Sequence, residues 1–316
     1  MKPAFVSTEA GFFFYVLSIN HMAVEVSPLR FFVLAGPTAV GKSEFAVEIA
    51  EQLGTEIVGA DAFQIYRGFQ ILSGKPSSAL QERVKHHLID VLPVTENCDA
   101  ARYATLAGEE IARLNRRGLV PLVVGGSGFY INALVTPLPD IPGSDPDVRA
   151  QLSTEPLDSL LSELAERDPE AFREIDRSNR RRVERAIEVI RVTGKPFSFH
   201  RRSTPDEHQV PGLVLTRPRI ELHRRINERV QWMLENGAIE EVASASEMSL
   251  TAGQMIGVPE IRRFLAKEIP LEECVRTVQA ATRQYAKRQI TWFKKQPFLA
   301  FDAEGSVQEA VEFFRQ

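Results

Sequence analysis

The chain has few cysteines and no hydrophobic run long enough to cross a membrane. Cys98 and Cys274 are its only cysteines, so the sequence offers neither a disulfide framework nor a cysteine spacing typical of a metal site. The apolar run at residues 11–19 is much shorter than the roughly 20 residues that span a bilayer. No small-residue cleavage pattern follows it, as a secretory signal would require. We therefore expect a cytoplasmic protein with no membrane partner, and interpret residues 1–28 as an N-terminal extension.

The sequence also lacks an excess of positive charge. Its 38 lysines and arginines are outnumbered by 42 aspartates and glutamates, which gives a net charge of −4. Many nucleic-acid-binding proteins are strongly basic, but binding a phosphate backbone requires only a local basic face. With 44% hydrophobic and 25% charged residues among 316, the composition is that of a globular protein of about two domains.

Short apolar runs alternate with amphipathic segments in the first part of the chain. Apolar runs that end at glycine, proline or aspartate predict buried strands, and apolar residues three or four positions apart predict helices. The expected strands cover residues 31–35, 56–60, 88–92 and 119–124, and the expected helices cover residues 43–53 and 100–115. This alternation is typical of an α/β fold whose parallel sheet is covered by helices on both faces.

The pattern changes near residue 136. The proline-rich residues 136–146 predict a linker, and residues 147–202, rich in glutamate and arginine, predict helices. One further strand is expected at residues 213–215, followed by long helices. The predicted organisation is an α/β core with C-terminal helices (residues 29–140 and 207–316) and a mainly helical insertion domain (residues 141–206).

Residues 36–43 (GPTAVGKS) fit the phosphate-loop pattern G-x-x-x-x-G-K-[ST] between an expected strand and an expected helix. Backbone N–H groups of such a loop and the helix N-terminus bind phosphate oxygens. Lys42 would add a full positive charge, and Ser43 would hold a Mg²⁺ ion that bridges the phosphates. The predicted diphosphate-binding set is Gly36, Pro37, Thr38, Ala39, Val40, Gly41, Lys42 and Ser43. The expected core is therefore like that of P-loop NTPases.

This loop predicts a polyphosphate ligand without identifying it as ATP. A kinase also needs a carboxylate at a strand end to hold the metal ion, and the strand at 119–124 ends in glycines. Asp61, which follows the strand at 56–60, could supply that carboxylate. A nucleotide or small-molecule kinase therefore remains an alternative, as does a non-catalytic RNA-binding P-loop ATPase.

Five segments occur together in one order. They are GPTAVGKS at 36–43, DAFQIYRG at 61–68, HHLIDV at 86–91, GGSGFYINAL at 125–134 and TRQYAKRQITWFKK at 282–295. In these segments the chain resembles the tRNA dimethylallyltransferases, also called tRNA isopentenyltransferases, along nearly its whole length from about Leu29. The last segment is the most diagnostic, because phosphate loops occur in many unrelated enzymes.

The resemblance implies an alkyl transfer. The N6 amine of the adenosine 3′-adjacent to the anticodon in tRNA attacks the first carbon of dimethylallyl diphosphate, and diphosphate leaves with the help of Mg²⁺. Asp61 matches the family's general base, a role that suits a carboxylate beside a weakly nucleophilic amine. Thr38, Ser127 and Arg225 match catalytic contacts around the diphosphate and the reacting carbon. Ser127 stands where threonine is commoner.

The resemblance also implies a monomer that binds the anticodon stem-loop, partly through the insertion domain. Residues 61–64 match the segment that reads the extruded nucleotide, although Ala62 and Phe63 replace a typical Ser-Met pair. Val258 and Pro259 replace a Tyr-Lys/Arg pair. The expected tRNA-binding residues are Asp61, Ala62, Phe63, Gln64, Ser127, Arg149, Arg181, Arg182, Val183, Glu184, Arg185, Lys287, Arg288 and Lys294. Structural roles are expected for His86 and His87, since neighbouring strand residues point to opposite faces.

Overall fold

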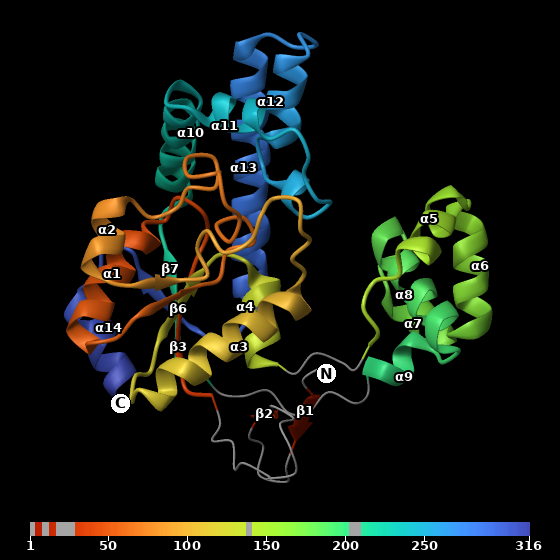
Figure 1. Ribbon diagram of the computed structural model, residues 1–316, viewed down its shortest axis with the longest axis horizontal. Helices are drawn as coiled ribbons and strands as arrows, with labels where there is room; N and C mark the ends of the chain where they lie inside the picture. The colour runs from red at the N-terminus through yellow and green to blue at the C-terminus, as the bar shows by residue number, and fades with distance from the viewer. Residues whose placement is uncertain (1–3, 8–12, 17–28, 137–140, 202–209) are drawn as a thin grey trace. The chain divides into compact units, whose positions relative to one another are not determined.

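The computed structural model describes residues 4–7, 13–16, 29–136, 141–201 and 210–316. The chain divides into two compact units, which are coloured along the sequence in Figure 1. The core unit comprises Met1–Val135 and His208–Gln316, and the helical unit comprises Thr136–Glu207. Most of residues 1–28, interpreted from the sequence as an extension, lies outside the described residues. The two short strands described there, β1 (Ala4–Ser7) and β2 (Phe13–Val16), pair with each other in antiparallel fashion.

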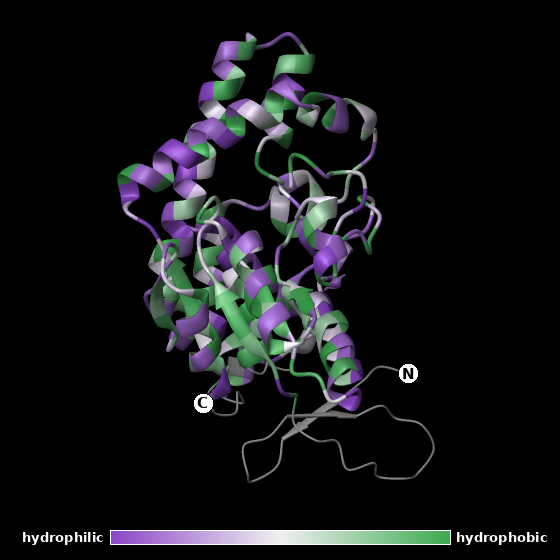
Figure 2. Cartoon of the chain, turned by 90° about the vertical axis from the view of Figure 1, so that its left-hand side faces the viewer, coloured by the Kyte–Doolittle hydropathy of each residue, from purple (hydrophilic) through white to green (hydrophobic). Residues whose placement is uncertain are grey.

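A six-stranded parallel sheet forms the centre of the core unit. Its strands, in spatial order, are β5 (His86–His87), β4 (Ile57–Gly59), β6 (Leu122–Gly125), β3 (Phe32–Ala35), β7 (Gly212–Thr216) and β8 (Leu299–Asp302). The predicted α/β class with a parallel sheet is thereby confirmed. The middle strands are drawn as hydrophobic in Figure 2, as is typical of a sheet covered on both faces.

Alternate residues of each strand pack into separate hydrophobic cores on the two faces of the sheet. Leu34 of β3 faces one core, while Val33 and Ala35 face the other. The first core also contains side chains of α1 (Lys42–Leu53), α10 (Arg219–Glu235), α11 (Ala238–Ser244), α12 (Val258–Leu265), α13 (Leu271–Phe293) and α14 (Val307–Arg315). The second also contains side chains of α3 (Ala100–Arg116) and α4 (Gly128–Val135). Two short elements, α2 (Ser78–Arg83) and the 3₁₀ turn η1 (Ala252–Gln254), complete the unit.

The predicted strand at residues 88–92 is wrong. The strand pairing lies two residues earlier, in β5, and the backbone then enters a turn because Leu88 and Asp90 have φ values of 60° and 56°. A strand requires negative φ, so these residues end it. The turn brings Asp90 within 2.7 Å of the buried Lys75 ammonium. His87, in β5, contacts Glu56 and Glu110 through its two ring nitrogens at 2.6 Å.

The helical unit has its own small core. It contains α5 (Pro146–Thr154), α6 (Leu157–Arg167), α7 (Pro169–Glu174), α8 (Arg180–Thr193) and α9 (Phe197–Arg201). The residues buried between these helices include Leu152, Leu160, Leu164 and Ile187. Asp168, which is buried, accepts hydrogen bonds from Ala171 N, Ser198 N and Ser198 Oγ. The expected linker is one residue too long, because Pro146 begins α5 after the N-cap Asp145.

None of the helices in the described ranges is both long and apolar enough to span a lipid bilayer.

Candidate active site

Three neighbouring strands deliver the predicted catalytic groups to one edge of the sheet. The phosphate loop follows β3, Asp61 follows β4, and Ser127 follows β6. These strands are parallel and adjacent in the order β4-β6-β3, so their carboxyl ends meet where open α/β sheets bind ligands. A pocket of about 650 Å³ lies at this edge, and its lining includes Lys42 and Asp61.

Two residues of the phosphate loop, Ala39 and Gly41, have left-handed backbone geometry. Gly41 precedes α1 with φ 107°, and Ala39 has φ 63°; glycine adopts such left-handed geometry at little cost. The Lys42 ammonium donates hydrogen bonds to Gly36 O (3.0 Å) and Pro37 O (2.8 Å), which holds it over the loop. Burial lowers the pKa of Lys42 to about 8, although the negative charge of Asp61 opposes the shift. Lys42 therefore places a buried ammonium group beside the loop that is predicted to bind the diphosphate.

Asp61 is held by the backbone that follows it. Its Oδ1 accepts hydrogen bonds from Phe63 N (2.9 Å) and Gln64 N (3.3 Å). Ser127 Oγ accepts a hydrogen bond from Ala62 N at 2.9 Å, so the loop after β4 is tied to the loop after β6. Asp61 Oδ2 has no hydrogen bond to the residues that the structure describes. The carboxylate therefore retains an oxygen that can accept a proton from a ligand.

Helix α10 adds two arginines to the pocket. Arg225 Nε donates to Ala39 O at 2.9 Å, which places this guanidinium against the phosphate loop. Arg229 donates to Gly74 O at 3.2 Å, and Gln64 Nε2 donates to the same oxygen at 2.9 Å. Burial lowers the pKa of Arg229. Arg224 lies on the outer side of the helix, where it pairs with two glutamates.

Helix α13 supplies two pocket residues, Tyr285 and Gln289, that were not among the site residues predicted from the sequence. Tyr285 lines the pocket. Burial, and then the charge of Asp61, raise the pKa of Tyr285 to about 12, so the phenol stays protonated at neutral pH. Gln289 is 5% exposed and also lines the pocket. Both residues stand in the most diagnostic segment, but nothing in their spacing identified their partners.

Apolar residues form another part of the pocket wall. They are Leu72, Met233, Met255 and Ile256. The pocket thus combines a cationic wall, which can bind a diphosphate, with an apolar wall, which can bind a short hydrocarbon.

The donor set fits a hard cation bound together with a phosphate ligand. Ser43 is the second residue of α1 and lines the pocket. The described residues contain no group of three or more histidine, cysteine, aspartate or glutamate side chains that could hold a metal by themselves. Mg²⁺ commonly uses one or two protein oxygens and takes its other ligands from substrate phosphates and water. A single hydroxyl beside the phosphate loop is therefore sufficient.

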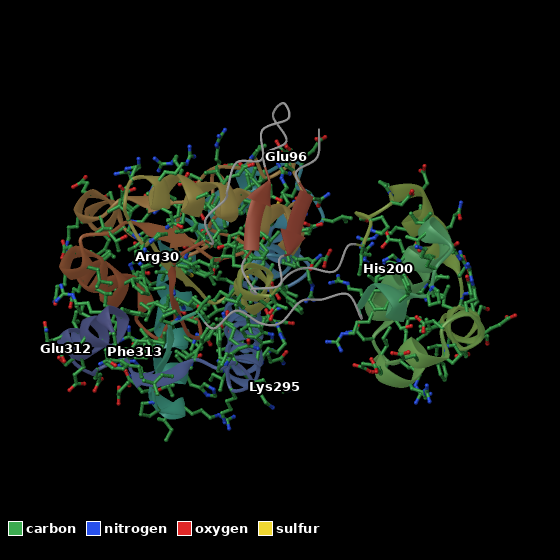
Figure 3. All side chains as sticks on the ribbon, turned by 90° about the horizontal axis from the view of Figure 1, so that it is seen from below. Arg30, Glu96, His200, Lys295, Glu312 and Phe313 are labelled. Atoms are coloured by element: carbon green, nitrogen blue, oxygen red, sulfur yellow. The ribbon has the colours of Figure 1, made fainter. Side chains whose placement is uncertain are left out.

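The residues expected to bind tRNA outside the pocket differ in their availability. Val183 was expected to bind tRNA, but its side chain is completely buried in the core of the helical unit. Arg185 and Arg149 both pair with the buried Glu188, at 2.7 and 3.1 Å, and Glu184 pairs with Arg180 at 2.7 Å. Exposed side chains remain at Arg181, Arg182, Lys287, Arg288 and Lys294. Lys295, next to the last of these, is labelled in Figure 3.

Comparisons with known proteins agree on one family. The IPP transferase family model matches residues 64–296. A tRNA dimethylallyltransferase of Akkermansia muciniphila is 42% identical over 266 residues, which cover 84% of this chain and 90% of that protein. The tRNA dimethylallyltransferase 1 of Citrifermentans bemidjiense is 43% identical over 275 residues, which cover 85% of this chain and 90% of that protein.

Two solved structures of such transferases are also similar to this chain. The tRNA isopentenylpyrophosphate transferase of Bacillus halodurans has a TM-score of 0.66 at 32% identity, and the match covers 91% of this chain and 96% of that one. A eukaryotic dimethylallyltransferase studied while acting on tRNA has a TM-score of 0.77 at 26% identity, covering 89% and 77%.

Proposed function

This chain belongs to the IPP transferase family and is a tRNA dimethylallyltransferase, and we propose that its acceptor is the N6 amine of the adenosine 3′-adjacent to the anticodon. The donor is dimethylallyl diphosphate. The observation that supports the proposal is the convergence of the phosphate loop, Asp61 and Arg225 on one pocket with a cationic and an apolar wall.

We propose that the diphosphate binds to the phosphate loop, Lys42 and Arg225. Bond formation between N6 and the first carbon of the dimethylallyl group accompanies cleavage of that carbon's bond to the diphosphate oxygen. The electron pair of the broken bond stays on the diphosphate, where preorganised cations and N–H donors stabilise it. Mg²⁺, held by Ser43, would neutralise part of this charge when bound. The dimethylallyl carbons would lie along the apolar wall.

Asp61 would accept the proton that N6 loses. Its oxygen without a partner among the described residues is available for the N–H of the amine, because the other oxygen is held by Phe63 and Gln64. The adenine must leave its stack to reach this carboxylate, as in other enzymes that modify bases. We propose that Ala62, Phe63 and Gln64 line the entry of the extruded nucleotide.

The direct test uses unmodified tRNA and two candidate donors. We expect purified protein with Mg²⁺ and dimethylallyl diphosphate to convert one adenosine per tRNA into its N6-dimethylallyl derivative, detected by nucleoside mass analysis. The same incubation with ATP should leave the RNA unchanged, and a phosphorylated product would favour the kinase alternative. A Cβ at Gly125 would collide with Ala60 O, so no carboxylate fits at the last residue of β6, and a kinase would have to hold its metal ion with Asp61.

We propose that the exposed cations Arg182, Lys287 and Lys294 bind tRNA phosphates. Replacing any one of them by alanine is expected to weaken binding of all tRNAs. The slope of log affinity against log salt concentration should become shallower by roughly 0.7–0.9 for each phosphate whose cation is removed. The transfer rate at saturating tRNA should not change. Titrations of tRNA binding across a salt series measure the slope.

Two variants sharpen this test. Arg180→Ala serves as the contrast within α8, because Arg180 bonds Leu152 O, Glu155 O and Glu184 inside the helical unit. It should lower the unfolding temperature and leave the salt slope unchanged. Arg225→Ala should slow transfer at least about tenfold even at saturating tRNA. Unaltered slopes for all three surface variants would show that the basic residues do not contact phosphates.

We also propose that the enzyme is a cytoplasmic monomer. The cytoplasm supplies its tRNA, and the groups assigned to the chemistry all come from one chain.

A further inference from the structure

Gln289 connects the two loops that would hold the diphosphate donor and the acceptor amine. Its side-chain oxygen accepts a hydrogen bond from the Thr38 N–H of the phosphate loop at 2.9 Å. Its side-chain nitrogen donates to Gly126 O at 2.8 Å, in the loop that carries Ser127. Gln289 is 5% exposed, so little water can compete for either bond. One neutral side chain thus bonds to both loops at once.

The loop after β6 is shaped to receive this helix. A Cβ on Gly126 would collide with Gln289 Nε2, and a Cβ on Gly128 would lie 2.5 Å from the ring of Trp292. Gln289 and Trp292 are three residues apart, on one face of α13. The glycines therefore allow α13 to approach the backbone on both sides of Ser127.

A continuous set of hydrogen bonds leads from the anion site to the proposed base. Thr38 N bonds to Gln289, Gln289 bonds to Gly126 O, and the next residue, Ser127, accepts from Ala62 N beside Asp61. Within this set, the side chain of Gln289 joins the phosphate loop to the loop after β6. A shift of its amide would change the separation of the phosphate loop from Asp61.

We propose that Gln289 is a positioning residue that fixes the phosphate loop relative to the Ser127 loop and so sets the distance between the donor carbon and the acceptor amine. The inference rests on the proposed function, since it takes the diphosphate to bind at one loop and the amine at the other. A displacement reaction needs its reacting atoms about 3–3.5 Å apart, and a misplacement of about 1 Å can cost roughly 10²-fold in rate.

The test separates hydrogen bonding from space filling. Gln289→Met retains the length of the side chain but makes neither bond, Gln289→Glu retains the acceptor for Thr38 N, and Gly126→Ala displaces the amide without changing it. Gln284→Met is the matched control, because Gln284 is exposed on the same helix. Single-turnover transfer is measured at saturating tRNA and dimethylallyl diphosphate, with tRNA affinity and the unfolding temperature measured in parallel.

We expect Gln289→Met and Gly126→Ala to lower the rate constant roughly 10²-fold with full conversion of tRNA at long times. Gln289→Glu should lose less, the control should match the wild type, and tRNA affinity should change little. If Gln289→Met does not fold, the rate constants of Gly126→Ala and Gln289→Glu test the inference. A folded variant that retains the wild-type rate constant would overturn the inference. So would a variant in which the extent of conversion falls while the rate constant does not change. A wild type that transfers nothing would instead overturn the proposed function.

Discussion

Replacing Asp61 by asparagine is expected to lower the rate of dimethylallyl transfer by roughly 10²–10⁴-fold, the range expected for loss of a general base. Asparagine keeps an oxygen that can accept from Phe63 N and Gln64 N, so the loop after β4 should retain its shape. It cannot take the proton from the amine. Alanine would be a poorer choice, because it would also release those two backbone amides.

The measurement is single-turnover transfer, followed by nucleoside mass analysis, at saturating tRNA and donor. Affinity for tRNA should stay within a few-fold of the wild type, because Asp61 makes one of many contacts. Asp158→Asn provides the same chemical change at an exposed position of α6. It should leave the transfer rate unchanged. If Asp61→Asn transferred at the wild-type rate, the proton would have to leave by another route.

The strands that position the site could be predicted from the sequence, because each is a short apolar run that ends at glycine or aspartate. The other strands depend on distant partners. β5 ends early because the buried Lys75 attracts Asp90 into a left-handed turn, and local pattern contains no trace of that pair. β8 was missed although residues 298–301 (FLAF) form a short apolar run that ends at Asp302. It is an edge strand whose residues are mostly exposed, and long helices were expected in this part of the chain.

The site was only partly accessible to sequence reasoning. The phosphate-loop pattern specifies its own backbone, so its ligand class followed directly. Gln289 was missed because its partners lie 251 and 163 positions earlier in the chain, and such contacts exist only after folding. The pairing of Arg185 with Glu188 was visible, since residues three apart on a helix meet. The density of positive charge alone does not show which arginines already have partners.

The largest effect after Asp61 is expected at Lys42. Lys42→Met removes the buried cation of the phosphate loop, and loss of one preorganised group of this kind lowers the rate roughly 10²–10³-fold. Affinity for dimethylallyl diphosphate should fall as well, because the charge also acts on the bound donor. Lys267→Met, at an exposed position after α12, is the matched control and should change neither quantity.

The pH dependence of donor binding tests the same residue. The pKa of Lys42 is about 8 in the free protein, and a bound diphosphate raises it because opposite charge favours the ammonium. Near pH 7 the lysine is mostly protonated before and after binding, so its titration should not affect affinity there. Above pH 8 binding must take up a proton, so affinity should fall by up to about tenfold per pH unit. Lys42→Met should abolish this fall. Donor titrations from pH 6 to pH 10 would contradict the assignment if wild type and variant followed the same curve.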